Sequence, residues 1–250
     1  GFNSVSLYSA VMTRGDRVIV GSSAIREFVQ ANYKVPPERL RDVPRGVDMT
    51  AFDPARVDPQ VVAERRREWG LDSRRVVSMV GRVTELKGHD TYLRALAEVQ
   101  RQMPDIKGLI VGGAASNKTE YLKSLHALAD ALGVEVTFAG AQDDMLTMYA
   151  LSDVVVSAAH STPESFGRTA AEALAMDTPV VASAHGGSLD IVHDGVNGLF
   201  FPPGDAACLA DQIVKAIDYP FRDMRAHIAK NFSLEHMVET ELAVYRELVA

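Results

Sequence analysis

The sequence contains little of what several classes of protein require. Cys208 is the only cysteine among the 250 residues, which excludes an internal disulfide and argues against a metal site built from thiolates. No apolar run approaches the roughly 18 residues of a membrane-spanning helix, and the N-terminus lacks the charged and apolar regions of a signal peptide. The expected location is therefore cytoplasmic, with peripheral contact at the inner face of the membrane left open.

The sequence also lacks an excess of basic residues. Its formal net charge is −7, whereas a face that binds nucleic acid usually needs a basic domain, so nucleic acid is not an expected partner. The composition, with 47% hydrophobic and 24% charged residues, is that of an ordinary globular protein. Such a chain can form one large domain, or one domain plus part of another.

From about residue 76 onward, short apolar segments alternate with amphipathic ones. The expected strands are Val76–Gly81, Ile106–Val111, Val134–Phe138, Val154–Ser157, Pro179–Ala182 and Leu199–Phe201. The expected helices are His89–Gln102, Thr119–Leu132, Asp143–Leu151, Thr169–Met176, Ala206–Ile217, Phe221–Lys230 and Leu234–Leu248. Uninterrupted apolar strands between helices are typical of a parallel sheet buried on both faces. The sequence therefore predicts a doubly wound α/β domain.

The first 60 residues are organised differently. Arg17–Gly21 predicts a short strand, and either of the two serines that follow can cap a helix over Ala24–Asn32. Pro36-Pro37 ends this helix, and prolines recur through a connector from Pro54 to Pro59. A domain junction is predicted in this region.

The stretch from Pro163 to Leu174 places a turn and a helix start between two carboxylates, Glu164 and Glu172. If every residue between them were helical, they would lie roughly 12 Å apart at ~1.5 Å per residue, about the length of a sugar-diphosphate-ribose unit. A helix start binds phosphate through free N–H groups and the positive end of its dipole, and carboxylates accept from hydroxyls. An ordinary helix with a capping carboxylate and a solvated glutamate fits these residues equally well.

Other loops after the expected strands carry cations and glycines. In a doubly wound sheet, ligands bind outside the carboxyl ends of the strands. Arg82 can grip two phosphate oxygens, and Lys87 supplies a compact charge. Leu86 replaces the glycine that a Walker loop has before its lysine, and Gly112-Gly113 lacks the glycine spacing of a dinucleotide fold. Together, these loops suit a diphosphate flanked by two hydroxylated groups.

With these motifs, the region from about Val76 to Phe201 resembles the donor-binding, carboxy-terminal domain of a retaining glycosyltransferase of the GT-B fold, glycosyltransferase family 4 (group 1). The resembling motifs are Gly81-Arg82, Lys87-Gly88, Pro163-Glu164-Ser165-Phe166-Gly167 with Glu172-Ala173, Pro179-Val180-Val181-Ala182, Gly186-Gly187, Asp194-Gly195-Val196-Asn197-Gly198 and Pro203-Gly204-Asp205. The implied fold has two Rossmann-like domains with the reaction in the cleft between them. The resemblance divides the chain into the end of an amino-terminal acceptor domain with its linker (1–50), a nucleotide-sugar donor-binding domain (51–232) and a carboxy-terminal crossing helix (233–250).

The resemblance also implies roles for single residues. Arg82 and Lys87 would hold the donor diphosphate and stabilise the leaving group, and Glu164 would contact the donor sugar. Glu172 would bind the ribose, and Gln142 would lie near the base. The remaining donor-binding residues would be Gly81, Ser165, Phe166, Gly167, Arg168 and Thr169. No metal or separate cofactor is implied, since the cations and the helix dipole stabilise the diphosphate. A UDP- or GDP-linked donor and a glycan, lipid-linked or small-molecule acceptor are expected.

The chain is short for such an enzyme. Residues 1–34 resemble only the last strand and helix of the acceptor domain, and Pro44–Asp48 resembles the interdomain Pro-Asn-Gly-Val-Asp turn, with Arg45 in place of asparagine. The rest of that domain is therefore an expected partner. The last helix is expected to cross back to the first domain with its apolar face partly exposed, which predicts self-association.

Glycosyl transfer with retained configuration is the leading hypothesis. A nucleotide-sugar epimerase on the same scaffold is one alternative, and a nucleotide-sugar-binding module whose catalysis needs another chain is a second. His89, His160 and His185 lie near the proposed site and are interpreted as non-catalytic polar residues.

Overall fold

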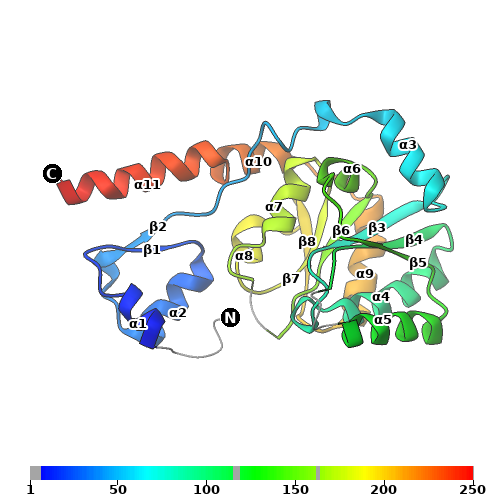
Figure 1. The fold of residues 1–250 in the computed structure, drawn as a ribbon, viewed down its shortest axis with the longest axis horizontal. Helices are drawn as coiled ribbons and strands as arrows, with labels where there is room; N and C mark the ends of the chain where they lie inside the picture. The colour runs from blue at the N-terminus through cyan, green and yellow to red at the C-terminus, as the bar shows by residue number, and fades with distance from the viewer. Residues whose placement is uncertain (1–6, 115–118, 162–163, 250) are drawn as a thin grey trace.

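The computed structural model describes residues 7–114, 119–161 and 164–249. Its main body is built on a six-stranded sheet in the order β5-β4-β3-β6-β7-β8 (Figure 1). The strands are β3 (Arg75–Val80), β4 (Ile106–Val111), β5 (Val136–Gly140), β6 (Val154–Ser157), β7 (Val180–Ser183) and β8 (Gly198–Phe201). Every neighbouring pair is parallel. The chain order reverses between β3 and β6, as in a doubly wound sheet, so the predicted fold class is confirmed.

Helices cover both faces of this sheet. One face packs against α3 (Pro59–Glu68), α6 (Met145–Ala150), α7 (Arg168–Ala175), α8 (Ser188–Ile191) and α10 (Met224–Asn231). The other packs against α4 (His89–Gln102), α5 (Thr119–Leu132) and α9 (Ala206–Ile217). The central strands β6 and β7 are buried along their whole length. Burial on two faces explains their unbroken apolar sequences, since each valine or leucine removed from water contributes about 1.5–3 kcal/mol.

A two-stranded sheet lies beside the main body, at the left of Figure 1. β1 (Val18–Val20) pairs in parallel with β2 (Leu40–Asp42), and α2 (Ser23–Tyr33) connects them. Ser22 caps α2, as predicted, because its Oγ accepts from the Ile25 N–H at 3.3 Å. β2 was not anticipated, since three residues of mixed character carry no periodic pattern and only their pairing with β1 makes them a strand. The remaining elements are α1 (Leu7–Met12) and the 3-10 turns η1 (Pro37–Arg39), η2 (Pro54–Arg56) and η3 (Glu85–Lys87).

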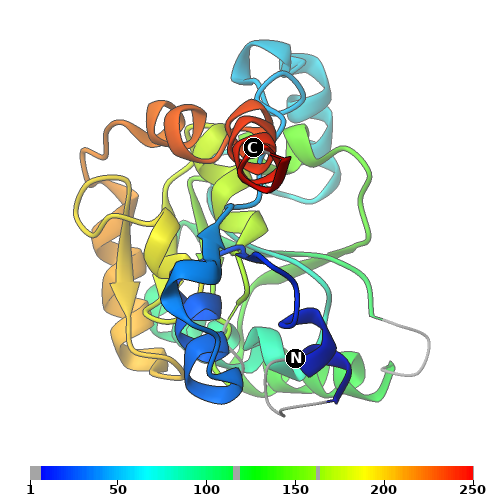
Figure 2. The ribbon, with the colours of Figure 1, turned by 90° about the vertical axis from the view of Figure 1, so that its left-hand side faces the viewer.

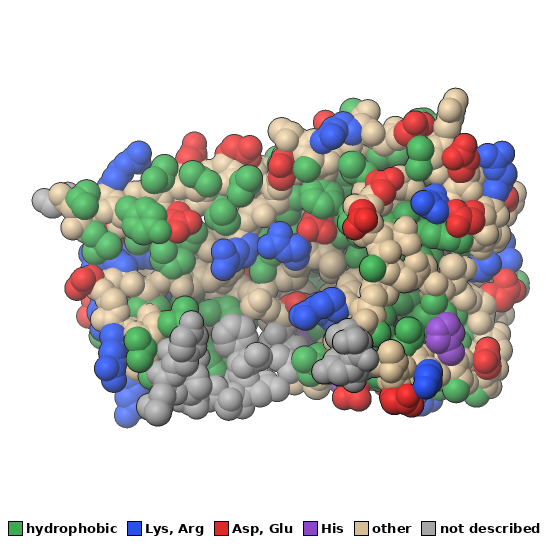
Figure 3. All heavy atoms as spheres, viewed as in Figure 1, with side chains coloured by type: hydrophobic (Ala, Val, Ile, Leu, Met, Phe, Trp, Pro, Cys, Tyr) green, Lys and Arg blue, Asp and Glu red, His purple; other side chains and the backbone are tan. Residues whose placement is uncertain are grey.

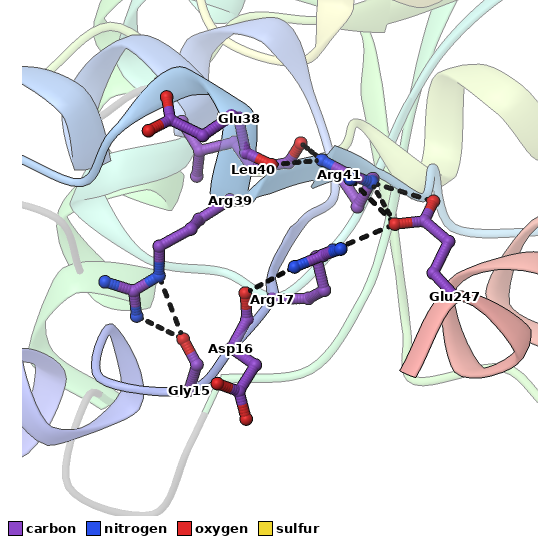
Figure 4. Close-up of polar contacts among 8 residues, drawn as sticks. All are labelled: Gly15, Asp16, Arg17, Glu38, Arg39, Leu40, Arg41 and Glu247. Carbon is purple, nitrogen blue, oxygen red and sulfur yellow. Dashed lines mark hydrogen bonds and ion pairs between the residues drawn. The ribbon is translucent and has the colours of Figure 1, made fainter. Parts of the chain in front are cut away.

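The last helix, α11 (Leu234–Val249), extends from the main body over the β1–β2 unit (Figures 1 and 2). Near its end, the Glu247 carboxylate accepts hydrogen bonds from Arg41 at 2.7 Å and Arg17 at 2.8 Å (Figure 4). These hydrogen bonds, that from Arg41 foremost, lower the pKa of Glu247 to about 2. At its start, the Leu234 N–H donates to the Val47 carbonyl at 2.9 Å, which joins α11 to the linker. The helix therefore connects the two units.

The outer face of α11 carries exposed apolar side chains. They are Leu234, Val238, Leu242, Tyr245, Leu248 and Val249, which are between 38% and 86% exposed. Hydrophobic side chains line this helix at the upper left of Figure 3. This exposure was expected from the sequence, and the self-association that it predicts stays a prediction. None of the described helices combines the length and the apolar character needed to cross a bilayer.

Candidate functional site

The candidate site lies where the loops leave the carboxyl ends of the central strands. Backbone hydrogen bonds join three of these loops: the Gly81 N–H donates to Val111, Val83 to Gly113, and Gly112 to Gly140, at 2.8–3.0 Å. Gly112 has a φ of 153°, and a Cβ there would lie 1.8 Å from the Gly81 carbonyl oxygen. The glycines thus permit backbone contact between the loops, and this contact holds the loops against one another at the edge of the sheet.

The loop after β3 brings both predicted cations to this edge. Gly88 has a φ of 76°, and a Cβ on it would lie 2.0 Å from the carbonyl oxygen of Ala158, in the loop after β6. This contact places Lys87 beside the β6 loop, where its ammonium pairs with the Glu164 carboxylate. Their side chains are only 25% and 20% exposed. Arg82 is exposed, and its guanidinium has no ion-pair partner within the described part of the chain.

His89 lies directly behind this loop, at the start of α4. Its side chain is completely buried, and burial lowers its pKa to about 4. Its ring contacts Tyr121 edge to face, with 6.4 Å between ring centroids. The neutral imidazole is therefore packed beneath the site, consistent with its interpretation as a non-catalytic residue.

The loop after β6 carries the first glutamate of the predicted motif; Pro163 of that motif lies outside the described residues. Phe166 is buried and packs against Phe232, with ring centroids 5.9 Å apart. The Gly187 N–H donates to the Glu164 carbonyl at 2.7 Å, and a Cβ on Gly187 would lie 2.5 Å from the Phe166 carbonyl oxygen. Gly187 thus supports the backbone of the β6 loop.

The structure confirms the turn predicted between the two glutamates, with the helix starting one residue before the expected Thr169. α7 begins at Arg168, and Gly167 before it has a φ of 89°, so the segment from Glu164 to Gly167 is not helical. The length of ~12 Å derived for a continuous helix therefore does not apply. Gly167 supplies no side chain to cap the helix, and the first backbone N–H to bond back is that of Ala171, to the Gly167 carbonyl at 3.1 Å. The helix start can thus accept an anion.

Glu172 lies one turn into α7, on the same side as Arg168. Its carboxylate is partly buried and accepts a hydrogen bond from the Tyr149 hydroxyl at 2.8 Å. Burial raises the pKa of Glu172, while Tyr149 and then Arg168 oppose this rise. Sequence reasoning missed Tyr149, since a single tyrosine in α6 gives no periodic or motif signal.

The other predicted residues lie on the same edge with fewer contacts among themselves. Ser165 is exposed, Thr169 is partly buried, and Gly81 directly follows β3. Gln142 follows β5, where its side-chain amide donates to the Ala139 carbonyl at 2.6 Å and so folds back on its own loop. The structure thus joins Lys87 with Glu164 directly, whereas no hydrogen bond connects Gln142 with either of them among the described residues.

A cavity of about 650 Å³ lies between the β1–β2 unit and the β6 loop. Its walls include Arg17 and Arg45 from the first unit, and Ser165 and Phe166 from the second. The cavity therefore lies next to the candidate site, on the side that faces the β1–β2 unit. Within the described ranges, no three His, Cys, Asp or Glu side chains gather closely enough to hold a metal ion.

The chain was compared with known families, proteins and solved structures, and each comparison gives matches. A family model described as Glycosyl transferases group 1 matches residues 61–233. The D-inositol 3-phosphate glycosyltransferase of Mycobacterium sp. (strain JLS) is 35% identical over 248 residues, which cover 96% of this chain and 54% of that protein. The chain therefore spans about half the length of the curated relatives it matches.

Solved structures match both units of the chain. A glycosyltransferase from Rickettsia africae ESF-5 is similar with a TM-score of 0.88 and 27% identity, covering 97% of this chain and 66% of that one. Anabaena Alr3699/HepE, solved in complex with UDP and glucose, gives a TM-score of 0.81 and 27% identity, over 94% of this chain and 63% of that one.

Proposed function

The chain belongs to the glycosyl transferases group 1 family, and from this we propose that it binds a nucleotide-sugar donor for a retaining glycosyl transfer. One observation carries the proposal: the uncapped start of α7 lies between the Lys87–Glu164 pair and Glu172. This arrangement offers cations and free N–H groups to a diphosphate, with a carboxylate on either side for hydroxyl groups. The complex of Anabaena Alr3699/HepE with UDP and glucose favours UDP as the carrier of the sugar.

The diphosphate is proposed to lie against Arg82, Lys87 and the α7 start. Lys87 is paired with Glu164, so its charge is held at the edge of the sheet. Arg82 is exposed and available to bind phosphate oxygens with its planar guanidinium. Arg168, at the first position of α7, adds a third positive charge at the same helix end. Electrostatic stabilisation by such fixed groups is the largest single contribution in many enzymes.

The two carboxylates are proposed to recognise the hydroxylated ends of the donor. Glu164 presents its carboxylate to the sugar, and Ser165, with the Phe166 and Gly167 backbone, completes the contact. Glu172 accepts hydrogen bonds from the ribose hydroxyls. Thr169, in the first turn of α7, lies between Glu164 and Glu172 in the sequence. Gln142, which follows β5, is proposed to lie next to the base.

In the proposed reaction, the bond between the anomeric carbon and the leaving phosphate oxygen breaks. The acceptor oxygen bonds to the same carbon on the same face, and its proton passes to the leaving phosphate oxygen. Arg82 and Lys87 offset the negative charge that develops on the diphosphate. Glu164 forms no covalent bond in this scheme, so trapping a glycosyl adduct on Glu164 would contradict it.

The acceptor is proposed to be a hydroxylated molecule such as a glycan, a lipid-linked sugar or a small polyol phosphate. The last class is favoured by relatives named D-inositol 3-phosphate glycosyltransferase. Those relatives are longer than this chain, and we propose that the additional segments take part in acceptor binding. We also propose a cytoplasmic location.

The test is calorimetric titration of the chain with UDP, GDP and ADP. We expect one nucleotide to bind saturably, and Glu172→Ala to weaken it by about 1–3 kcal/mol, the effect of losing hydrogen bonds to a charged group. Glu98→Ala is a matched control, since Glu98 is a partly exposed helical glutamate on α4 that pairs with Arg101. Equal binding by the Glu172 and Glu98 variants would contradict the proposed ribose contact.

A second measurement separates the proposal from its alternatives. Release of nucleoside diphosphate from the nucleotide sugar, dependent on an added acceptor, is expected for a transferase. Conversion of the donor into its epimer without an acceptor would favour an epimerase instead. Donor binding without turnover, even after the segments present in the longer relatives are added, would favour a binding module.

A further inference from the structure

The Glu172 carboxylate is held by one side chain outside the proposed set of donor-binding residues. The Tyr149 hydroxyl donates to Glu172 Oε2 at 2.8 Å across 23 residues of sequence. We propose that Tyr149 is a positioning residue that fixes Glu172 and keeps it ionised, and thereby sets the preference for a ribonucleotide over a deoxyribonucleotide. This inference rests on the proposed donor site and adds a specificity determinant to it.

Burial explains why Glu172 needs such a partner. A carboxyl group in a partly buried place tends to take up a proton, and burial does raise the pKa of Glu172. A protonated carboxyl loses acceptor capacity, whereas an ionised one accepts with both oxygens. The hydrogen bond from Tyr149 is the largest influence that opposes the effect of burial, ahead of the charge of Arg168. Tyr149 thus preserves the form of Glu172 that can accept from a diol.

Tyr149 is suited to act as a permanent donor. Its side chain is completely buried, and burial together with the Glu172 charge raises its pKa well above the ordinary value. The phenol therefore stays protonated at any physiological pH. It occupies only Oε2, and Oε1 has no hydrogen-bond partner among the residues that the structure describes. The geometry leaves Oε1 for the ligand.

The Tyr149 ring is itself fixed from the other side. Phe52, in the linker, meets it edge to face with ring centroids 6.1 Å apart. The Arg225 guanidinium donates to the Phe52 carbonyl at 2.5 Å and to the Ala175 carbonyl, at the end of α7, at 2.6 Å. The linker that packs on Tyr149 is thus anchored to the helix that carries Glu172. Small movements of the hydroxyl relative to Glu172 are thereby restricted.

The first test requires no ligand. Tyr149→Phe keeps the ring and removes only the hydroxyl, and the Glu172 pKa is followed through its ¹³C-labelled carboxyl carbon as pH changes. We expect the Glu172 pKa to rise by about one pH unit or more, as for the loss of a hydrogen bond to a charged group. Tyr92→Phe is the matched control, because Tyr92 is also completely buried but donates to the Val77 carbonyl on the opposite face of the sheet. An unchanged Glu172 pKa in Tyr149→Phe would overturn the proposal.

The second test measures specificity. UDP and 2′-deoxy-UDP are titrated into the wild type and both variants between pH 5 and 8. In Tyr149→Phe, we expect the preference for UDP to fall about tenfold at pH 7, and UDP binding to weaken at a higher pH than in the wild type. A uniform loss for both nucleotides would indicate a merely structural role and overturn the proposal.

The outcomes also distinguish this inference from the function on which it rests. If the wild type binds UDP, and Tyr149→Phe keeps both the ribose preference and the pH profile, the inference is wrong and the donor site stands. If the wild type binds none of UDP, GDP or ADP, the donor site is wrong and the inference is overturned with it.

Discussion

The contacts inside the main body differ from those that attach the β1–β2 unit to α11. In the main body, β3 is buried except for its first residue, and the loops at its end touch through glycine backbones. In the smaller unit, Ile19 at the middle of β1 is 42% exposed, and Glu247 ties the strands to α11 through exposed ion pairs. The Lys87–Glu164 ion pair at the candidate site is more buried than either of these.

This difference indicates where stability and function are concentrated. Apolar burial and close backbone contact contribute far more than exposed ion pairs, which are worth little individually. The candidate site thus stands on the most strongly supported part of the molecule, as a site needs when distances decide its chemistry. The smaller unit is attached by contacts that are easier to lose.

The largest effect is expected where the loops of the main body touch. Gly112→Ala would bring a Cβ to within 1.8 Å of the Gly81 carbonyl oxygen, at a φ of 153° that favours glycine. We expect the free energy of unfolding to fall by about 3 kcal/mol or more, from overlap and backbone strain together. Chemical denaturation measures it.

Gly133→Ala is its control, because Gly133 also has a positive φ, of 66°, but a Cβ on it would meet no atom within 4 Å. This variant should cost only about 1–2 kcal/mol. Equal decreases in the free energy of unfolding in the two variants would show that contact between the loops does not contribute to stability. The main body would then not be stabilised by its loop contacts as expected for Gly112.

The next effect depends on pH and concerns His89. The unfolded imidazole has a pKa near 6.5 and the buried one near 4, so the unfolded state binds more protons between these values. The free energy of unfolding should therefore decrease as pH falls from 6.5 to 4, by about 3 kcal/mol from this residue. Denaturation of the wild type and His89→Leu at several pH values measures the contribution. The variant should show a flatter dependence, and parallel curves would contradict the assignment.

The smallest effect is expected at the contact between α11 and the β1–β2 unit. Glu247→Gln removes the charge that pairs with Arg17 and Arg41, and should change the thermal midpoint by less than about 2 °C. Because the Glu247 pKa is lowered to about 2, the contribution of its charge is present above about pH 4.5 and is lost as pH falls towards 2.

Hydrogen exchange gives a more sensitive reading of this contact. Amides of β1 and β2 should exchange faster in Glu247→Gln, while those of β6 and β7 stay unchanged. Glu235→Gln, on the same helix and also exposed, should leave both sheets unaffected. Faster exchange in β6 would mean that the smaller unit supports the main body, and the contrast between the two regions would have to be abandoned.

The sequence by itself determined the sheet and most of the helices. The unbroken apolar run of β6 is buried on both faces, and this requirement is visible in its consecutive valines. The cap of α2 by Ser22 was equally local, since a serine before a helix bonds to a nearby N–H. The turn before α7 was likewise predicted from local residues, whereas the three-residue β2 could not be predicted, because it becomes a strand only by pairing with β1.

The candidate site divides in the same way. Arg82, Lys87, Glu164 and Glu172 were recognised from the sequence because they follow strands or lie in one motif. Only the tertiary structure decided that Lys87 pairs with Glu164, that Gly187 supports the backbone of the Glu164 loop, and that Tyr149 holds Glu172. Local sequence specifies which residues reach the edge of the sheet, whereas contacts between distant segments specify how each side chain is held there.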